Sequence, residues 1–244
     1  MSLLQVKHLQ KIYSTRFSSQ KVEALKDVSF DVEEGEYIAI MGESGSGKTT
    51  LLNILASLDK PTSGEVLLDN QDLTKISDKH ISAFRRDNLG FVFQDFNLLD
   101  TFNVADNIYL PLVLSKEPYA LMKPKLDKLA KPLGIDHLLE KYPYEISGGQ
   151  KQRLAIARAI AKNPDIYIFD DSFSALDFKT DAKLRQELNQ LVKKTKSTVL
   201  LVGQRIASIM DADQIIVLDE GRIVGKGTHD ELMKSCQVYQ EIAY

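Results

Sequence analysis

One eight-residue stretch constrains this chain more than any other: Gly42-Glu43-Ser44-Gly45-Ser46-Gly47-Lys48-Thr49. It matches the pattern G-x-x-x-x-G-K-[ST], and it stands between the apolar run 37–41 and the helix-like run 50–55. Glycines let the backbone of such a loop turn its N–H groups toward phosphate oxygens, and the helix N-terminus adds about half a positive charge. The stretch therefore predicts a strand, a phosphate-binding loop and a helix, in that order.

The pattern also predicts roles for single side chains in this loop. Lys48 is expected to meet the β- and γ-phosphates of a nucleotide, and Thr49 is expected to coordinate Mg²⁺. A chance Gly/Ser-rich turn is the alternative, and the flanking strand and helix argue against it. The further loop residues expected to contact the nucleotide are Gly42, Ser44, Gly45, Ser46, Gly47 and Thr50.

Composition limits what the rest of the chain is expected to do. The 244 residues are 43% hydrophobic and 27% charged, as in an ordinary globular protein. No apolar run approaches the ~18 residues of a membrane span, and the first residues lack the pattern of a secretory signal. A net charge of −3 gives no general attraction for nucleic acid, so no nucleic-acid partner is expected. The single Cys236 excludes an internal disulfide, and we expect it near the surface without a redox role.

The order of apolar patterns predicts an α/β fold with an insertion. The first thirty-odd residues alternate apolar and polar, which indicates an antiparallel sheet. Runs 65–69, 89–93, 166–169, 198–202 and 214–218 are expected to be strands, and 77–87 and 179–194 helices. Residues 98–163 show helical periodicity interrupted by five prolines. We therefore expect a single domain over 1–244, with its core at about 1–94 and 164–244 and a helical subdomain at about 95–163.

A second possible anion-binding motif lies at Ile146-Ser147-Gly148-Gly149-Gln150, before the expected helix 151–162. Serine and two glycines at a helix N-terminus suit an anion. One nucleotide needs only one phosphate loop, so a second such element makes sense if it closes over the γ-phosphate of a nucleotide held by another cassette. A flexible Gly-Gly cap is the alternative.

Several further residues extend the predicted site. Asp170 ends an apolar run that is typical of a buried parallel strand, where its carboxylate suits the Mg²⁺ shell beside Thr49. Gln94 ends the strand that precedes the helical region, and Ser174-Ala175-Leu176-Asp177 follows Asp170 after a short turn. Tyr13 is placed to stack on adenine, with ordinary packing as an equally good alternative.

Taken together, these motifs resemble the nucleotide-binding subunit of ATP-binding cassette (ABC) transporters, over essentially all of the chain. The resemblance implies a P-loop NTPase (RecA-like) α/β core with an antiparallel β subdomain and an inserted α-helical subdomain. It implies an ATPase that binds ATP and Mg²⁺ between two cassettes paired head to tail. Gln94 and the helical insertion would transmit closure to a transmembrane permease subunit, at the cytoplasmic face of the membrane.

The resemblance assigns three sets of site residues. Catalytic roles fall on Asp171, Gln204, Gln94 and Lys48. Metal binding falls on Thr49, Gln94 and Asp170. Nucleotide binding falls on Tyr13, Gly42, Ser44, Gly45, Ser46, Gly47, Lys48, Thr49, Thr50, Ser147, Gly148, Gly149, Gln150 and Asp177.

Two residues depart from the pattern of hydrolytic cassettes. Asp171 stands where most carry the glutamate that activates water, and Gln204 stands where a switch histidine is usual. A shorter carboxylate and an amide that cannot titrate predict weak hydrolysis at this chain's own site. Paired losses of this kind resemble the degenerate site of heterodimeric exporters. The alternative is that both residues are working variants with normal turnover.

The two parts of the chain resemble different branches of the family. Residues up to about 158 resemble stand-alone cassettes of antimicrobial-peptide resistance and lipoprotein release, whereas residues from about 165 resemble cassettes fused to multidrug or peptide exporters. An exporter of peptides or drugs is therefore expected. The alternatives are a regulatory module that dimerises on ATP without productive turnover, and a soluble cassette protein that acts outside transport.

Overall fold

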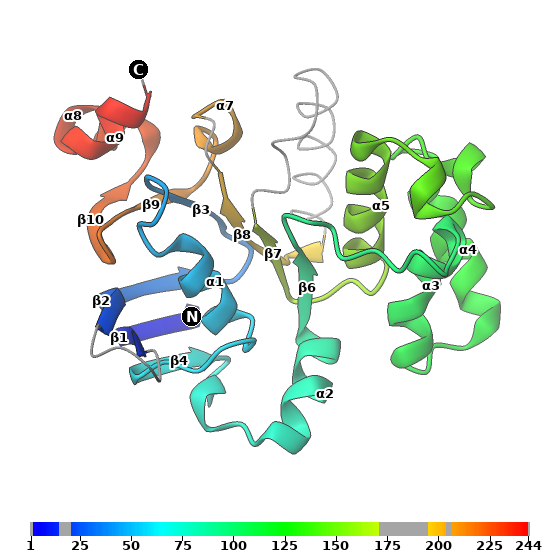
Figure 1. Cartoon of the computed structure of the whole chain (residues 1–244), viewed down its shortest axis with the longest axis horizontal. Coiled ribbons are helices and arrows are strands. Elements are labelled where there is room, and N and C mark those ends of the chain that lie inside the picture. Colours follow the sequence, from blue (N-terminus) through cyan, green and yellow to red (C-terminus); the bar gives the residue numbers. More distant parts are fainter. Residues whose placement is uncertain (1, 15–20, 171–194, 204–205, 244) are drawn as a thin grey trace. The chain divides into compact units, whose positions relative to one another are not determined.

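The structure is a computed structural model that describes residues 2–14, 21–170, 195–203 and 206–243. It divides into two compact units (Figure 1). The first unit contains residues 1–82 and 198–244, and the second contains residues 83–197. The single domain with the boundaries given above stays a prediction.

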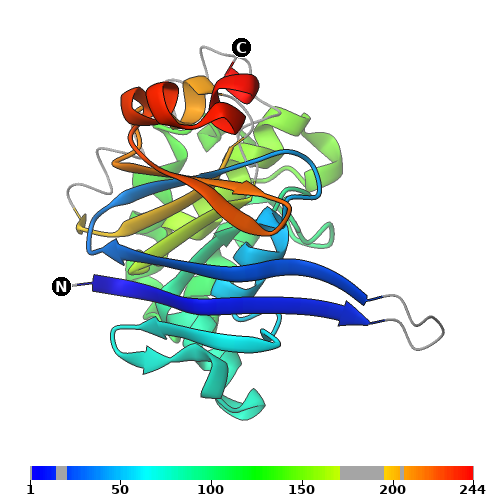
Figure 2. The same ribbon diagram turned by 90° about the vertical axis from the view of Figure 1, so that its left-hand side faces the viewer.

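The first unit contains an antiparallel sheet with the strand order β2-β1-β4-β5. Its strands are β1 (Ser2–Ser14), β2 (Lys21–Glu33), β4 (Ser63–Leu68) and β5 (Gln71–Asp72). Figure 2 shows β1 and β2 as long neighbours near the N-terminus. Alternate residues such as Val6 and Val28 are buried, so one face of the sheet belongs to the core. This confirms the antiparallel sheet predicted from the alternation.

A second set of strands in the same unit is mostly parallel. The central strand β3 (Tyr37–Met41) lies between β8 (Thr198–Val202) and β9 (Gln214–Asp219), parallel to both. Every residue of β8 is buried, which explains why its last four residues, 199–202, are all apolar. The edge strand β10 (Arg222–Gly227) runs antiparallel to β9. β10 was not predicted from the sequence, because one face of the strand carries two glycines after Ile223 and the other carries Arg222 and Lys226 around Val224.

The helices of this unit are short. They are α1 (Lys48–Leu55), the 3-10 turn η1 (Leu73–Lys75), α7 (Ile206–Ile209), α8 (His229–Ser235) and α9 (Gln237–Ala243). Cys236, between α8 and α9, is only 5% exposed, so the expectation that it lies near the surface was wrong. Gly225 leaves it room, since a Cβ at Gly225 would come within 2.7 Å of the Cys236 sulfur.

The second unit joins a parallel strand pair to a group of helices. Helix α2 (Asp78–Asn88) leads into β6 (Leu89–Val92), which pairs with β7 (Ile166–Asp170). The helices are α3 (Val104–Leu114), α4 (Tyr119–Ala130) and α5 (Gly148–Ile160), with 3-10 turns η2 (Asp136–Leu138) and η3 (Pro143–Glu145). In Figure 1, α3, α4 and α5 gather together, in agreement with the helical character predicted for 98–163.

Two prolines do not break the helices as the sequence analysis supposed. Pro111 lies inside α3 and Pro124 lies inside α4. A proline costs a helix one hydrogen bond and some strain. In α3 the neighbouring Ile108 and Leu112 are almost fully buried, and this burial offsets the cost. Across the described ranges, no helix is both long enough and apolar enough to cross a bilayer.

Candidate functional site

The phosphate loop joins the end of β3 to the start of α1, as predicted. Gly47 is the N-cap of α1 and has φ of 103° and ψ of 3°, a conformation that side chains other than glycine rarely adopt. A Cβ at Gly47 would lie 2.5 Å from the carbonyl oxygen of Ala24. Glycine is therefore required here both by the backbone conformation and by the close approach of β2.

Lys48 fills the centre of this loop. Its Nζ donates to the carbonyl oxygens of Gly42 at 2.8 Å and of Glu43 at 2.6 Å, and to Ser46 Oγ at 3.4 Å. Lys48 is only 9% exposed and Ser46 only 3%, so the loop wraps around the ammonium group. An ammonium held there attracts an anion that enters the loop.

The loop fits the phosphates of a nucleotide on three grounds. A cation is held at its centre, α1 points its N-terminus into it, and the first turn of α1 has no acidic residue. Thr49 is exposed and free of the core, as a metal ligand must be, whereas Thr50 is half-buried. When bound, Mg²⁺ would supply charge neutralisation of the phosphates; Lys48 and the loop backbone would hold those phosphates in place.

Tyr13 lies near the end of β1, also in the first unit, and is 41% exposed. Its hydroxyl donates to Asp59 Oδ2 at 2.8 Å, and the ammonium of Lys11 lies 4.8 Å from the ring centroid. Partial burial and the hydrogen bond to Asp59 raise the pKa of Tyr13 above its ordinary value. The ring is exposed enough to receive a planar base. That role stays a prediction.

The second predicted anion motif lies in the second unit, at the start of α5. Ser147 is the N-cap: its Oγ accepts from the Gln150 backbone N–H at 3.4 Å, and its own N–H donates to Gln150 Oε1 at 2.8 Å. This reciprocal pair is a capping box. Ser147 is exposed, and a Cβ at Gly148 would meet nothing within 4 Å among the described residues. The helix end is therefore open to a ligand, while the Gln150 side chain serves the cap.

Gln94 and Asp170 follow neighbouring strands of the second unit. Val92 of β6 pairs with Phe169 of β7 in parallel register, so Gln94 and Asp170 come after the same edge of this strand pair. Asp170 is 7% exposed, whereas Gln94 is exposed. Carboxylate and amide oxygens suit Mg²⁺, and the metal-binding role of these two residues stays a prediction. The predicted catalytic residues Asp171 and Gln204, and Asp177, lie outside the described residues.

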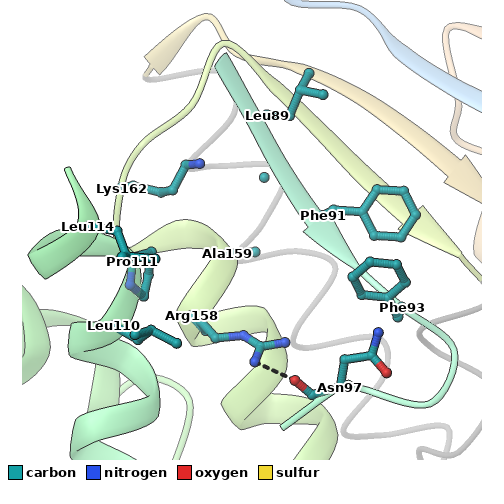
Figure 3. Close-up of a pocket in the computed structure, with 11 residues that line it drawn as sticks. Leu89, Phe91, Phe93, Asn97, Leu110, Pro111, Leu114, Arg158, Ala159 and Lys162 are labelled. Atoms are coloured by element: carbon teal, nitrogen blue, oxygen red, sulfur yellow. Dashed lines mark hydrogen bonds between the residues drawn. The ribbon is translucent and has the colours of Figure 1, made fainter. Parts of the chain in front are cut away.

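The structure also reveals a pocket that the sequence analysis missed. A cavity of about 280 Å³ is lined by apolar side chains of β6 and α3, and Arg158 and Lys162 also line it (Figure 3). Its lining residues are Leu89, Gly90, Phe91, Phe93, Asn97, Leu110, Pro111, Leu114, Arg158, Ala159 and Lys162. The sequence offered one signal for this pocket: Arg158 and Lys162 are four residues apart, with the small Ala159 between them.

The two cations of this pocket donate to backbone carbonyls. Arg158 donates to the carbonyl oxygens of Asn97 at 2.7 Å and Phe96 at 2.6 Å, and Figure 3 shows its guanidinium directed to Asn97. Lys162 donates to the carbonyl oxygens of Arg85 and Arg86. Burial lowers the pKa of Arg158, and it lowers the pKa of Lys162 to about 8. Two basic side chains therefore line an otherwise largely apolar pocket, one bound to carbonyls before β6 and the other to carbonyls after it.

Comparisons with known proteins agree with this geometry. Residues 25–174 match the family model described as ABC transporter. The chain is 43% identical to the ABC transporter ATP-binding protein YxdL of Bacillus subtilis, over 91% of this chain and 85% of that one. It is 40% identical to the bacitracin export ATP-binding protein BceA of Halalkalibacterium halodurans, over 91% and 87%. It is also 37% identical to the methionine import ATP-binding protein MetN of Haemophilus influenzae, over 94% and 66%.

Solved structures show the same fold. One is the dimeric post-hydrolysis state of the cassette MJ0796 of Methanocaldococcus jannaschii, bound to ADP and Pi. It superposes with a TM-score of 0.87 at 36% identity, covering 92% of this chain and 98% of that one. The expected P-loop NTPase fold and the expected ATP-dependent enzyme class are thereby confirmed. The chain belongs to the ABC transporter family, as an ATP-binding subunit with ATPase activity that binds ATP together with Mg²⁺.

Proposed function

We propose that this chain is the energy-coupling subunit of an exporter of peptides or drugs, and that it binds ATP in a head-to-tail dimer. The observation that carries the proposal is the buried ammonium of Lys48 inside the glycine loop, a cationic cradle for a triphosphate. The exposed, capped N-terminus of α5 at Ser147 supports the dimer, because one nucleotide bound to Lys48 leaves this second anion site for a nucleotide on another cassette.

The dimer is tested by separating ATP binding from ATP-driven association. Ser147→Asp keeps a good N-cap but places a negative charge where the γ-phosphate is expected. We expect this variant to bind Mg-ATP like the wild type in calorimetry yet to stay monomeric in sedimentation, whereas Lys48→Ala loses binding and association together. A Ser147→Asp chain that still dimerises with ATP contradicts the sandwich, and Lys48→Ala with unchanged affinity contradicts the ATP site.

Weak hydrolysis at the chain's own site is a second part of the proposal, and it rests on sequence alone. Asp171 and Gln204 replace the glutamate and histidine of hydrolytic cassettes. A general base and an electrostatic contact are each worth about 10²–10⁴-fold in rate. Single-turnover assays of Asp171→Glu, Gln204→His and the double variant should show a large gain over the wild type. Unchanged rates on restoration contradict weak hydrolysis.

The same assay weighs the alternative of a regulatory module. A chain that dimerises on ATP but gains no turnover from either restoration, even with a candidate partner cassette present, fits a regulatory module better than a transport motor. Association with a detergent-solubilised permease distinguishes a transport subunit, which should bind it, from a soluble cassette protein that acts outside transport, which should not. Relatives named for export and for import both match, so the direction of transport is decided by vesicle uptake assays.

We place the transmembrane permease subunit at the pocket beside α3, at the cytoplasmic face of the membrane. An apolar cavity whose lining includes Arg158 and Lys162 suits a short permease segment that carries apolar residues and a carboxylate. Leu114 lines the pocket and is 57% exposed, whereas its neighbour Val113 is 56% exposed and does not line it. Leu114→Asp should abolish co-purification with a co-expressed permease, and Val113→Asp should not. Equal effects contradict this docking site.

A further inference from the structure

We infer that Asp59 is a positioning residue that holds the ring of Tyr13 ready for the nucleotide base. The inference rests on the proposed ATP site and on the predicted role of Tyr13 in stacking on adenine. Asp59 lies 46 positions away in the sequence, in the turn after α1, and nothing in the motifs pointed to it. The carboxylate accepts from Tyr13 at the end of β1, and the Asp59 backbone N–H donates to Asn53 in α1, so Asp59 links β1 to the helix that begins at the phosphate loop.

The contacts fix the Tyr13 ring from two directions. The hydroxyl donates to Asp59 Oδ2 at 2.8 Å. The Lys11 ammonium lies 4.8 Å from the centroid, on one face of the ring, so a base has the opposite face to stack on. A tyrosine held at its hydroxyl end and on one face has little freedom to rotate.

Asp59 is itself held firmly. Its Oδ1 accepts from Lys11 Nζ at 2.7 Å and from the Lys60 backbone N–H at 2.7 Å, while its own N–H donates to the Asn53 carbonyl at 3.1 Å. Burial by itself raises the pKa of this carboxyl, but the hydrogen bonds from Lys11 and Tyr13 outweigh burial and hold the pKa below the usual range. Asp59 is therefore ionised at neutral pH and accepts on both oxygens.

The strands do not depend on this carboxylate. Tyr13 pairs with Val22 across the β1–β2 ladder, and the Ile12 backbone N–H donates to Thr62 Oγ1 at 2.9 Å. These contacts keep the end of β1 in place when Asp59 is replaced. The hydrogen bond to Asp59 consequently holds the Tyr13 side chain and not the backbone. Its loss should therefore weaken binding of the nucleotide base and leave binding of the phosphates unchanged.

The test compares two ligands that share their phosphates. Calorimetry with Mg-ATP and with magnesium tripolyphosphate, which has no base, is carried out on the full chain. Ordering one free side chain on binding costs a factor of about three to ten in affinity. We expect Asp59→Ala and Tyr13→Phe each to weaken ATP binding by that factor and to leave the tripolyphosphate affinity within about twofold of the wild type. The double variant should bind ATP no more weakly than either single variant.

Controls separate this inference from the proposed ATP site and from misfolding. Asp59→Asn keeps an acceptor for the Tyr13 hydroxyl and should restore most of the ATP affinity. Asp78→Ala removes an exposed carboxylate that pairs with Lys60 at 2.8 Å, and should change neither affinity. Three results overturn the inference: losses of ATP affinity that add in the double variant, equal losses for ATP and tripolyphosphate, or an unchanged ATP affinity in Asp59→Ala. A Lys48→Ala chain that keeps both affinities overturns the ATP site itself.

Discussion

Replacing Gly47 by alanine should destabilise the nucleotide-free chain much more than replacing Gly45, although both lie in the phosphate loop. Gly45 has φ of 83° and Gly47 has φ of 103°, so each substitution pays about 1–2 kcal/mol for a left-handed backbone. At Gly45 an added Cβ meets no described heavy atom within 4 Å. At Gly47 it lies 2.5 Å from the Ala24 carbonyl oxygen and 2.9 Å from Leu25 Cδ2.

The contact with Ala24 sets the size of the difference. Forcing an extra methyl against packed backbone typically costs about 1–3 kcal/mol, so Gly47→Ala should lose about 2–5 kcal/mol and Gly45→Ala about 1–2 kcal/mol. The measurement is urea unfolding followed by circular dichroism, without nucleotide, with the slope checked for constancy. Equal losses in the two variants, or a greater loss in Gly45→Ala, refute the reasoning that β2 approaches the loop at Gly47.

Three further predictions concern the second unit. Ser147→Ala should lower the free energy of unfolding by about 1 kcal/mol through loss of the N-cap, whereas Ser147→Asp should not lower it. Equal urea midpoints for the wild type and both variants contradict this prediction. Gln152 is fully buried, and neither polar atom of its side chain has a hydrogen-bond partner among the described residues. Gln152→Met should therefore raise the free energy of unfolding by about 1–3 kcal/mol. A lower urea midpoint would show instead that the amide of Gln152 is hydrogen-bonded. The pKa of Lys162 is about 8 in the folded chain and 10.5 in an exposed lysine, so the unfolded chain binds more protons between these two values. The stability of the wild type relative to Lys162→Met should therefore rise from pH 8 to about 10.5. Urea unfolding at pH 7.5, 9 and 10 that shows no such rise refutes this prediction.

The elements that the sequence predicted well are those set by local pattern. The strand before Gly42 forms where expected, and the helices expected at 50–55 and 151–162 form with their starts two and three residues earlier. A phosphate loop needs glycines at fixed offsets, and an N-cap needs serine followed three residues later by glutamine, so a short stretch of chain contains the whole signal. The helix around Pro111 was not predictable in this way, because the burial that offsets the cost of a proline is not visible in local sequence.

Features that join distant residues were not predictable in this way. The pocket at Arg158 and Lys162 needs carbonyls from residues 96–97 and 85–86, and the buried environment of Cys236 needs Gly225 of β10. Propensity and periodicity describe neighbours along the chain only. Asp171, Asp177 and Gln204 fall outside the described residues, so their roles stay predictions from sequence.

The amino-acid order is enough to predict a triphosphate-binding loop around Lys48 and a second helix N-terminus at Ser147 that suits an anion. The enclosure of Lys48 by loop carbonyls, and the hydrogen bond from Tyr13 to Asp59, become visible only in the folded chain. The difference lies in the range of the forces involved. Backbone turns and helix caps are fixed within a few residues, whereas burial and side-chain hydrogen bonds depend on which distant segments pack together.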